Sequence, residues 1–174
     1  MDRGQAERLM PIAEEILAEG GASWADLDAL AVCVGPGNFT GLRIAVAAVR
    51  GLALGLGRPA IGVTRLEALA WGTMGARLVT IDAGRGAVWA QAFAEGAATG
   101  PAALVEATRL AEIAPEATRA GWAAGETQLA DPATIARIAA GRLEAPGTLP
   151  APLYLRHPDA APPSEAAPRI LDEA

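Results

Sequence analysis

Apolar residues recur along the first part of the chain in a pattern that predicts alternating helices and strands. From Gly4 to Gly20 they return at steps of three and four residues, which predicts an amphipathic helix. Pro11 falls inside this helix and lacks an amide donor, so we expect a kink or a late helix start there. The continuous apolar run from Leu30 to Val34 predicts a strand that is covered on both faces.

A second strand and two helices follow a glycine-rich stretch. Thr40 is placed to cap a helix that runs from Gly41 to about Gly55. The run from Ala60 to Val63 predicts another short strand, and Thr64 with Glu67 forms the capping box of the next helix. Strand, helix, strand and helix in this order are typical of a parallel α/β fold.

The second half of the chain predicts a hairpin and then a region with little periodic contrast. The segments Leu78–Ile81 and Val88–Phe93 flank a glycine-rich turn, which predicts two strands of a second lobe. Alanine dominates the sequence after this hairpin. Only Leu110–Ile113 and Ile135–Ala140 stand out there, and both predict short helices. We also expect Trp122 to lie near a strand. The predicted division is a first lobe at 1–76, a second lobe at 77–150, and a partly mobile C-terminal segment at 151–174.

The charge and the cysteine count narrow the classes of function. The 174 residues include 14 basic and 20 acidic side chains, and a net charge of -6 disfavours direct, unaided binding to RNA. Cys33 is the single cysteine, so no internal disulfide forms and a reducing cytoplasm is the expected compartment. Arg50 and Arg58 interrupt the longest apolar region, and no signal peptide precedes it, so we expect no membrane partner.

The glycine turn between the first predicted strand and its helix has the geometry of a phosphate site, because helix N-termini bind anions. No lysine follows Gly41, however, and the spacing fits neither a Walker loop nor a dinucleotide fingerprint. On general physical grounds a structural turn is the better interpretation. The weak candidates for nucleotide binding are Gly35, Gly37, Asp82 and Gly84.

Beyond these local patterns, longer strings of the sequence resemble one family. The string GPGNFTGLRI at residues 35–44, followed by AVAAVRGLALGLGRPAIGVTRLEALA, closely resembles the signature of the bacterial TsaB (YeaZ) family. Residues 5–11 resemble the first long helix of that family, residues 81–88 resemble its second-lobe hairpin, and residues 152–156 with 158–160 resemble its C-terminal signature. Asn38, where the family usually has serine, and Ala45, where it often has glycine, are departures, and both are small.

The resemblance implies a fold and a role. TsaB proteins have the actin-like, sugar-kinase-like (ASKHA) fold of two similar lobes, and they are partner subunits in making threonylcarbamoyladenosine on tRNA. The resemblance implies that the chain is not an enzyme by itself and needs no cofactor. Its implied partners are the catalytic subunit TsaD, the ATPase TsaE and a second copy when it is alone, while tRNA is met only through the complex.

The resemblance also suggests where the partner binds. TsaB is thought to pair with TsaD through its first two helices, and the apolar stripes of the two predicted helices are the candidates here. Either stripe could instead be ordinary core. The candidate partner residues are Leu9, Ile12, Ile16, Leu42, Ala45, Val46 and Val49.

Two features bear on catalysis. TsaD carries two metal-binding histidines four residues apart on a helix, and the matching positions here are Arg65 and Leu69, while the only histidine is His157. A stand-alone nucleotide-binding phosphotransferase of the same fold is the alternative function. The family also begins with a β-hairpin that would precede the first helix. Its apparent absence leaves three readings open: a fragment, a gene start assigned too late, or a reduced first lobe.

Overall fold

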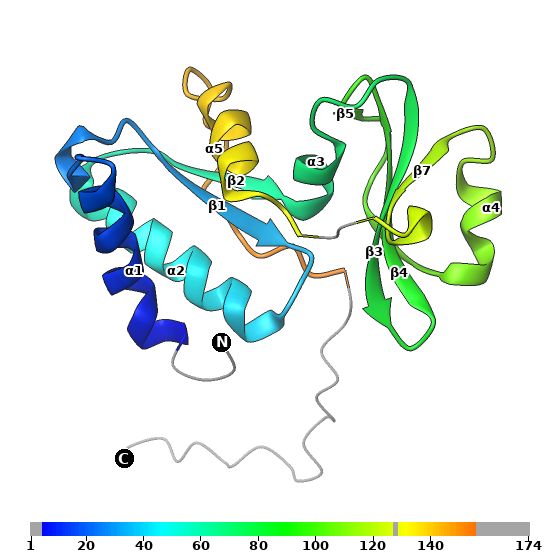
Figure 1. Ribbon diagram of the computed structural model, residues 1–174, viewed down its shortest axis with the longest axis horizontal. Helices are drawn as coiled ribbons and strands as arrows, with labels where there is room; N and C mark the ends of the chain where they lie inside the picture. The colour runs from blue at the N-terminus through cyan, green and yellow to red at the C-terminus, as the bar shows by residue number, and fades with distance from the viewer. Residues whose placement is uncertain (1–4, 127–128, 156–174) are drawn as a thin grey trace, which may run out of the picture.

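The computed structural model describes residues 5–126 and 129–155, which form two sheets with helices packed around them (Figure 1). This α/β architecture agrees with the predicted class. The elements in chain order are α1 (Gln5–Glu19), η1 (Trp24–Asp26), β1 (Leu30–Gly35), α2 (Phe39–Leu56), β2 (Ala60–Thr64), α3 (Arg65–Ala70), β3 (Ala76–Gly84), β4 (Ala87–Ala94), β5 (Ala97–Ala98), β6 (Ala103–Glu106), η2 (Ala107–Arg109), α4 (Leu110–Ile113), β7 (Thr118–Gly121), η3 (Trp122–Ala124) and α5 (Pro132–Ala140).

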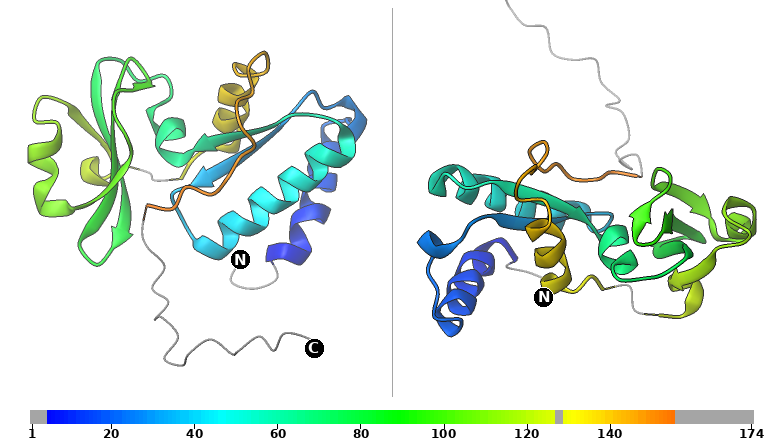
Figure 2. Two further views of the ribbon diagram at one scale, coloured as in Figure 1. Left: turned by 180° about the vertical axis from the view of Figure 1, so that it is seen from behind. Right: turned by 90° about the horizontal axis from the view of Figure 1, so that it is seen from above.

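The first sheet consists of the parallel strands β1 and β2, with Leu30 opposite Ala60 and Cys33 opposite Val63. Its two faces are covered by different helices, which lie on opposite sides of the sheet in the right-hand view of Figure 2. On one face, Val46 of α2 packs with β1 residues. On the other face, α5 packs with β2 and α3. Both faces are therefore covered, as the continuous apolar run predicts, although Ala31 and Cys33 on the second face are only half-buried.

The second sheet is built around the β3–β4 hairpin, which confirms the predicted strand pair. β7 pairs in parallel with β3, while the short strands β5 and β6 both pair with β4. Trp122 follows the end of β7 directly, as expected. The sheet packs on α3 through a cluster that includes Leu66, Val79 and Phe93. Helix α3 thus joins the cores of the two sheets.

The chain returns to the first sheet after it has built the second one. Ile135 and Ile138 of α5 are buried against β2, and the Leu153 amide donates a 2.8 Å hydrogen bond to the Val34 carbonyl at the end of β1. The predicted lobe boundaries at 76 and 150 stay a prediction. They place 132–150 with the second lobe, whereas these contacts are made with the first sheet. The expected mobility of the C-terminal segment concerns residues that lie mostly outside the described ranges.

Two local predictions need correction. Helix α2 begins at Phe39 and is capped by Asn38, whose Oδ1 accepts a 2.8 Å hydrogen bond from the Gly41 amide, so Thr40 is not the cap. Asparagine at position 38 precedes the first helical residue and reaches the third amide, which is the geometry a cap requires. Pro11 lies inside a single helix from Gln5 to Glu19, so the late start is also wrong.

One described helix, α2, is long and apolar enough to cross a membrane by length and composition alone, with a mean hydropathy of 1.5 over 18 residues. Such a segment is weak support for a membrane span. In the structure α2 covers one face of the first sheet, and 11% of this segment is buried, at Val46 and Ala53.

Candidate functional site

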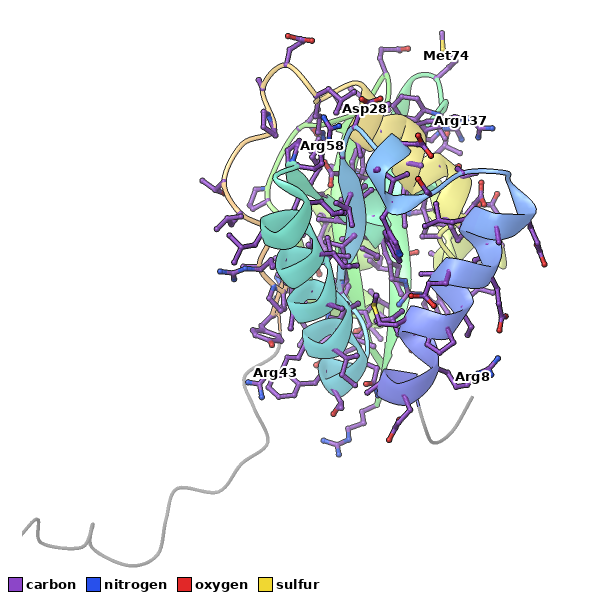
Figure 3. The ribbon with its side chains drawn as sticks, turned by 90° about the vertical axis from the view of Figure 1, so that its left-hand side faces the viewer. Arg8, Asp28, Arg43, Arg58, Met74 and Arg137 are labelled. Atoms are coloured by element: carbon purple, nitrogen blue, oxygen red, sulfur yellow. The ribbon has the colours of Figure 1, made fainter. Side chains whose placement is uncertain are left out.

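The two helices that the sequence singles out as a partner surface lie next to each other at one end of the molecule. α1 and α2 are in contact, and they are the two helices nearest the viewer in Figure 3, where Arg8 and Arg43 mark their lower ends. The predicted partner residues divide between exposed, half-buried and buried positions. Ile16 is 61% exposed, whereas Val46 is 3% exposed and belongs to the core of the first sheet. The half-buried ones are Leu9, Ile12, Leu42, Ala45 and Val49.

One stripe along α2 is thin and uncharged, while Arg43, Arg50 and Leu54 are exposed beside it. Ile44, Ala48, Gly51 and Gly55 follow one another at helical spacing, and we call them the outer face of α2. A Cβ atom added at Gly51 or Gly55 would meet nothing within 4 Å. Packing within the described residues therefore does not require glycine at either position. Glycine inside a helix destabilises the folded protein by roughly 0.5–1 kcal/mol relative to alanine.

The glycine turn after β1 has a structural explanation. Gly35 adopts a φ of +104°, and an added Cβ would lie 2.8 Å from the Leu42 side chain. Arg65 Nη1 donates a 3.1 Å hydrogen bond to the Pro36 carbonyl, and it would lie 3.6 Å from a Cβ at Gly37. The turn therefore directs α2 away from β1 and is held by a side chain from α3. This agrees with the interpretation of the turn as a structural connection.

Arg65 and Cys33 lie behind this turn, close enough for each to affect the pKa of the other. Burial lowers the pKa of the Arg65 guanidinium, and the nearby Cys33 acts in the opposite direction. Burial raises the pKa of the Cys33 thiol, against smaller effects of the Gly35 amide and of Arg65. Arg65 and Leu69 are the positions that the resemblance matches to the TsaD histidines. Arg65 is half-buried, and Leu69 packs against the apolar cluster between α3 and the second sheet. Within 5–126 and 129–155 no three His, Cys, Asp or Glu side chains come together as metal ligands, and His157 lies outside these residues.

The second glycine turn belongs to the β3–β4 hairpin. Asp82 Oδ1 accepts a 2.8 Å hydrogen bond from the Gly84 amide. Arg85 and Gly86 at its tip have φ values of 57° and 76°, as expected for a tight hairpin. Nucleotide binding by Gly35, Gly37, Asp82 and Gly84 remains a prediction.

A contact between α2 and the C-terminal segment was not found from the sequence. Arg43 Nε donates a 2.9 Å hydrogen bond to the Tyr154 hydroxyl, and its guanidinium carbon lies 3.8 Å from the centre of the Phe39 ring. The Phe39 and Tyr154 ring centres are 4.8 Å apart. The sequence indicates a solvated face for Arg43 and Arg50. Only the fold brings Tyr154, which follows Arg43 by 111 residues, beside Arg43.

Comparison with known proteins finds one matching family model and several sequence relatives. The family described as TsaD, tRNA N6-adenosine threonylcarbamoyltransferase, matches residues 1–136. An uncharacterized protein of Mycobacterium tuberculosis is 37% identical over 169 residues, which cover 92% of this chain and 79% of that protein. The Escherichia coli tRNA threonylcarbamoyladenosine biosynthesis protein TsaB is 43% identical over 95 residues, covering 51% of this chain and 41% of that protein.

Solved structures from Pseudomonas aeruginosa have the same fold. One, described as an uncharacterized protein with similarity to peptidase YEAZ, is 29% identical with a TM-score of 0.67, covering 87% of this chain and 84% of that one. A second, described as YeaZ, is 24% identical with a TM-score of 0.67, and covers 87% of this chain and 85% of that one.

Proposed function

The chain belongs to the TsaB (YeaZ) proteins, relatives of TsaD with the actin-like fold, and from this membership we propose that it is a non-catalytic subunit. Its place is in the threonylcarbamoyladenosine modification of tRNA. In this proposal it works in the cytoplasm, binds and supports a TsaD-like catalytic subunit, and helps to recruit a TsaE-like ATPase. It meets tRNA only within the complex, which suits a net charge of -6.

The outer face of α2 is the observation that carries the proposal. It presents Ile44, Ala48, Gly51 and Gly55 without a charged residue among them. Small residues on a helix let a second backbone approach closely, and the contact made there can offset the cost of glycine in the helix. A helix of the TsaD-like subunit is the occupant we assign to this face.

The exposed side of α1 extends the proposed contact. Ile16 is 61% exposed on a helix that already contacts α2. The proposed partner residues are the seven predicted ones, and they differ in how exposed they are. Ile16 can reach a partner directly, while Val46 supports α2 from within the core.

The catalytic chemistry is assigned to the partner. A TsaD-like subunit would transfer the threonylcarbamoyl group from its adenylate to N6 of the adenosine beside the anticodon. The half-buried Arg65, which donates to the Pro36 carbonyl, and Leu69, which packs on the second sheet, support this assignment, because neither side chain can replace an imidazole as a metal ligand.

The test is a binding measurement with the TsaD-like subunit of the same organism. Gly51→Asp places a carboxylate on the outer face, where the added atoms have room. We expect the affinity to fall at least tenfold and the far-ultraviolet circular dichroism to stay unchanged. Ala111→Asp is the control, because Ala111 is exposed on α4, at the end of the molecule opposite α1 and α2 (Figure 1), so the binding of this variant should stay near that of the unmodified chain.

The proposal fails if a variant that combines Ile16→Asp with Gly51→Asp binds the TsaD-like subunit as tightly as the unmodified chain. Analytical ultracentrifugation of the same variant tests the homodimer separately. If the homodimer uses the same surface, the variant should be monomeric at concentrations where the unmodified chain is dimeric.

A further inference from the structure

The surface formed by α2 and the segment after α5 carries basic but no acidic side chains. Residues 29–66 and 145–155 contain no Asp or Glu, although the whole chain has a net charge of -6. Arg43 and Arg50 are exposed, two turns apart on one side of α2, and exposed Arg58 follows the end of the helix. Figure 3 shows Arg43 and Arg58 at opposite ends of α2. Clustered in this way, a few cations can attract a negatively charged partner to an acidic protein.

A groove follows this side of α2. It consists of two hollows of about 440 Å³ and 520 Å³, and Arg50 lines both of them. The smaller hollow lies along the first half of α2 and has Arg43 and Tyr154 in its wall. The larger hollow lies at the end of α2 and is lined by Arg58 and Leu149. The groove therefore has arginines along its whole length, with the C-terminal segment as its second wall.

Two of these arginines have no partner within residues 5–126 and 129–155. Arg50 and Arg58 make no hydrogen bond, ion pair or ring contact there. Arg43 instead lies over the Phe39 ring and donates to the Tyr154 hydroxyl. The two aromatic residues are 39% and 43% exposed, so part of their ring surface is open to solvent. The groove thus combines unpaired guanidinium groups with accessible aromatic rings.

We propose that this groove binds a single strand of RNA, with phosphates at Arg50 and Arg58 and a base stacked on the Phe39–Tyr154 pair. The planar guanidinium group matches two oxygens of a phosphate, and exposed aromatic rings stack unpaired bases. Arg43 and Arg50 are about 10 Å apart along the helix axis. A helical nucleic-acid strand has a phosphate about every 3.4 Å along its axis, so the groove spans several nucleotides.

An acidic polypeptide is the other strand-like anion, and the groove fits it less well. An extended peptide usually gains its affinity from backbone hydrogen bonds. Pro150 and Pro152 in the C-terminal wall have no amide to donate, and the Leu153 amide already donates to the Val34 carbonyl. The amides inside α2 are bonded along the helix. The groove therefore offers a ligand mainly guanidinium groups and rings, which suit phosphates and bases.

The choice of tRNA as the source of this strand rests on the proposed function, which places the chain in a complex that modifies tRNA. Sequence-specific and shape-specific contacts to RNA are commonly made to its unpaired segments, where bases are free to stack on a protein. The groove borders the outer face of α2 at Gly51, so the RNA would lie beside the TsaD-like subunit. The arginines of the groove are therefore assigned to RNA and not to the subunit contact.

The experiment locates the contact by NMR and measures its strength by fluorescence anisotropy. The probe is an unmodified transcript of a tRNA that carries adenosine beside its anticodon. Low ionic strength strengthens phosphate contacts, so a weak contact is measurable with the full chain alone. We expect the transcript to change the amide chemical shifts of Ala47, Arg50 and Tyr154 and to leave those of β3 and β4 unchanged.

A variant that combines Arg50→Ala with Arg58→Ala should bind the transcript at least tenfold more weakly than the unmodified chain. Its plot of log affinity against log salt concentration should be shallower by about 1.4, at about 0.7 for each lost phosphate contact on a single strand. Arg137→Ala is the matched control, because Arg137 is an exposed arginine on α5 and does not line the groove. Its affinity should stay within twofold of that of the unmodified chain.

The inference is overturned if the transcript shifts no amide of the groove, or if the double variant binds it as tightly as Arg137→Ala does. It is also overturned if polyglutamate shifts the groove amides and the transcript does not, because an acidic protein would then be the occupant. Calorimetry with the TsaD-like subunit tests the proposed function separately. The double variant should bind that subunit normally, and a loss there would assign the arginines to the subunit contact instead. If the unmodified chain binds the transcript in the groove but not the subunit, the proposed function alone fails.

Discussion

Arg142 Nη2 lies 2.6 Å from Glu67 Oε1, and this ion pair ties the segment after α5 to the start of α3. Glu67 is also part of the helix cap, because its other oxygen accepts a 2.8 Å hydrogen bond from the Thr64 amide. Arg142 Nη1 donates to the Gly62 carbonyl of β2 as well. One carboxylate and one guanidinium therefore join three segments of the chain.

Replacing Arg142 by methionine should lower the free energy of unfolding by about 1–2 kcal/mol, because it leaves the Glu67 carboxylate and the Gly62 carbonyl without that donor. Urea denaturation measures the change. Arg109→Met is the control, since the Arg109–Glu112 pair is highly exposed and should contribute less than about 0.5 kcal/mol. Equal losses in the two variants would contradict the role given to Arg142.

Glu67 should make stability depend on pH. Burial opposes ionisation of Glu67, yet the Thr64 and Arg142 hydrogen bonds prevail and hold its pKa below 4.5. Because the folded-state pKa is lowered, its contribution is complete above the unfolded value and is lost as the pH falls through the folded value. In denaturation from pH 7 to pH 2, the stability difference between the unmodified chain and Glu67→Gln should shrink below about pH 4.5. A constant difference would exclude this linkage.

Glycines 35 and 55 should respond in opposite ways to alanine. Gly35→Ala places a Cβ against Leu42 at a φ of +104°, so we expect a loss of roughly 1–3 kcal/mol. Gly55→Ala adds a Cβ to a helix in open space and should stabilise the isolated chain by up to about 1 kcal/mol. If a partner helix approaches the outer face of α2, the same Gly55→Ala change should weaken binding of the TsaD-like subunit, as measured by calorimetry.

Tyr154 should hold the C-terminal segment against α2. Tyr154→Ala removes both the ring packing on Phe39 and the acceptor for Arg43, so exchange of the Leu153 amide should accelerate about fivefold or more. Tyr154→Phe keeps the ring and should have a smaller effect. Unchanged exchange at Leu153 in the alanine variant would show that its bond to Val34 holds the segment unaided.

Calorimetric titration with ATP separates the proposed function from the phosphotransferase alternative. We expect no ATP binding at micromolar concentration. The Leu42 side chain packs against Gly35 and Arg65 donates to the Pro36 carbonyl, so the turn is already in contact with other residues of the chain. Micromolar affinity together with ATP turnover would overturn the proposed function.

The local part of the fold could be predicted from the sequence, because short-range chemistry determines it. The Thr64–Glu67 capping box forms as expected, and so does the β3–β4 hairpin. The helix cap at Asn38 was missed because Asn38 and Thr40 both carry side chains that cap helices, so composition alone does not choose between them.

The sequence missed other features for two reasons, weak local patterns and contacts between distant residues. β6 and β7 lie in alanine-rich sequence, where little periodic contrast separates strand from loop. The contacts of Tyr154 and Arg142 join residues that are 111 and 75 positions apart. No pattern within a helix or strand encodes such pairs. The partner surface was predicted as two apolar stripes and stays a prediction, and the sequence could not show that Val46 of the second stripe is buried in the core of the first sheet.

The return of α5 to the first sheet sets an order for events on the ribosome. β1 and β2 are made early, but the helix that covers their second face begins at Pro132, and the Leu153 amide that bonds Val34 comes later still. The second sheet, whose strands are synthesised between residues 76 and 121, can assemble before that cover arrives. The sheet translated first is therefore completed last, because one face of its apolar strands lacks its covering helix until residues 132–140 have left the ribosome.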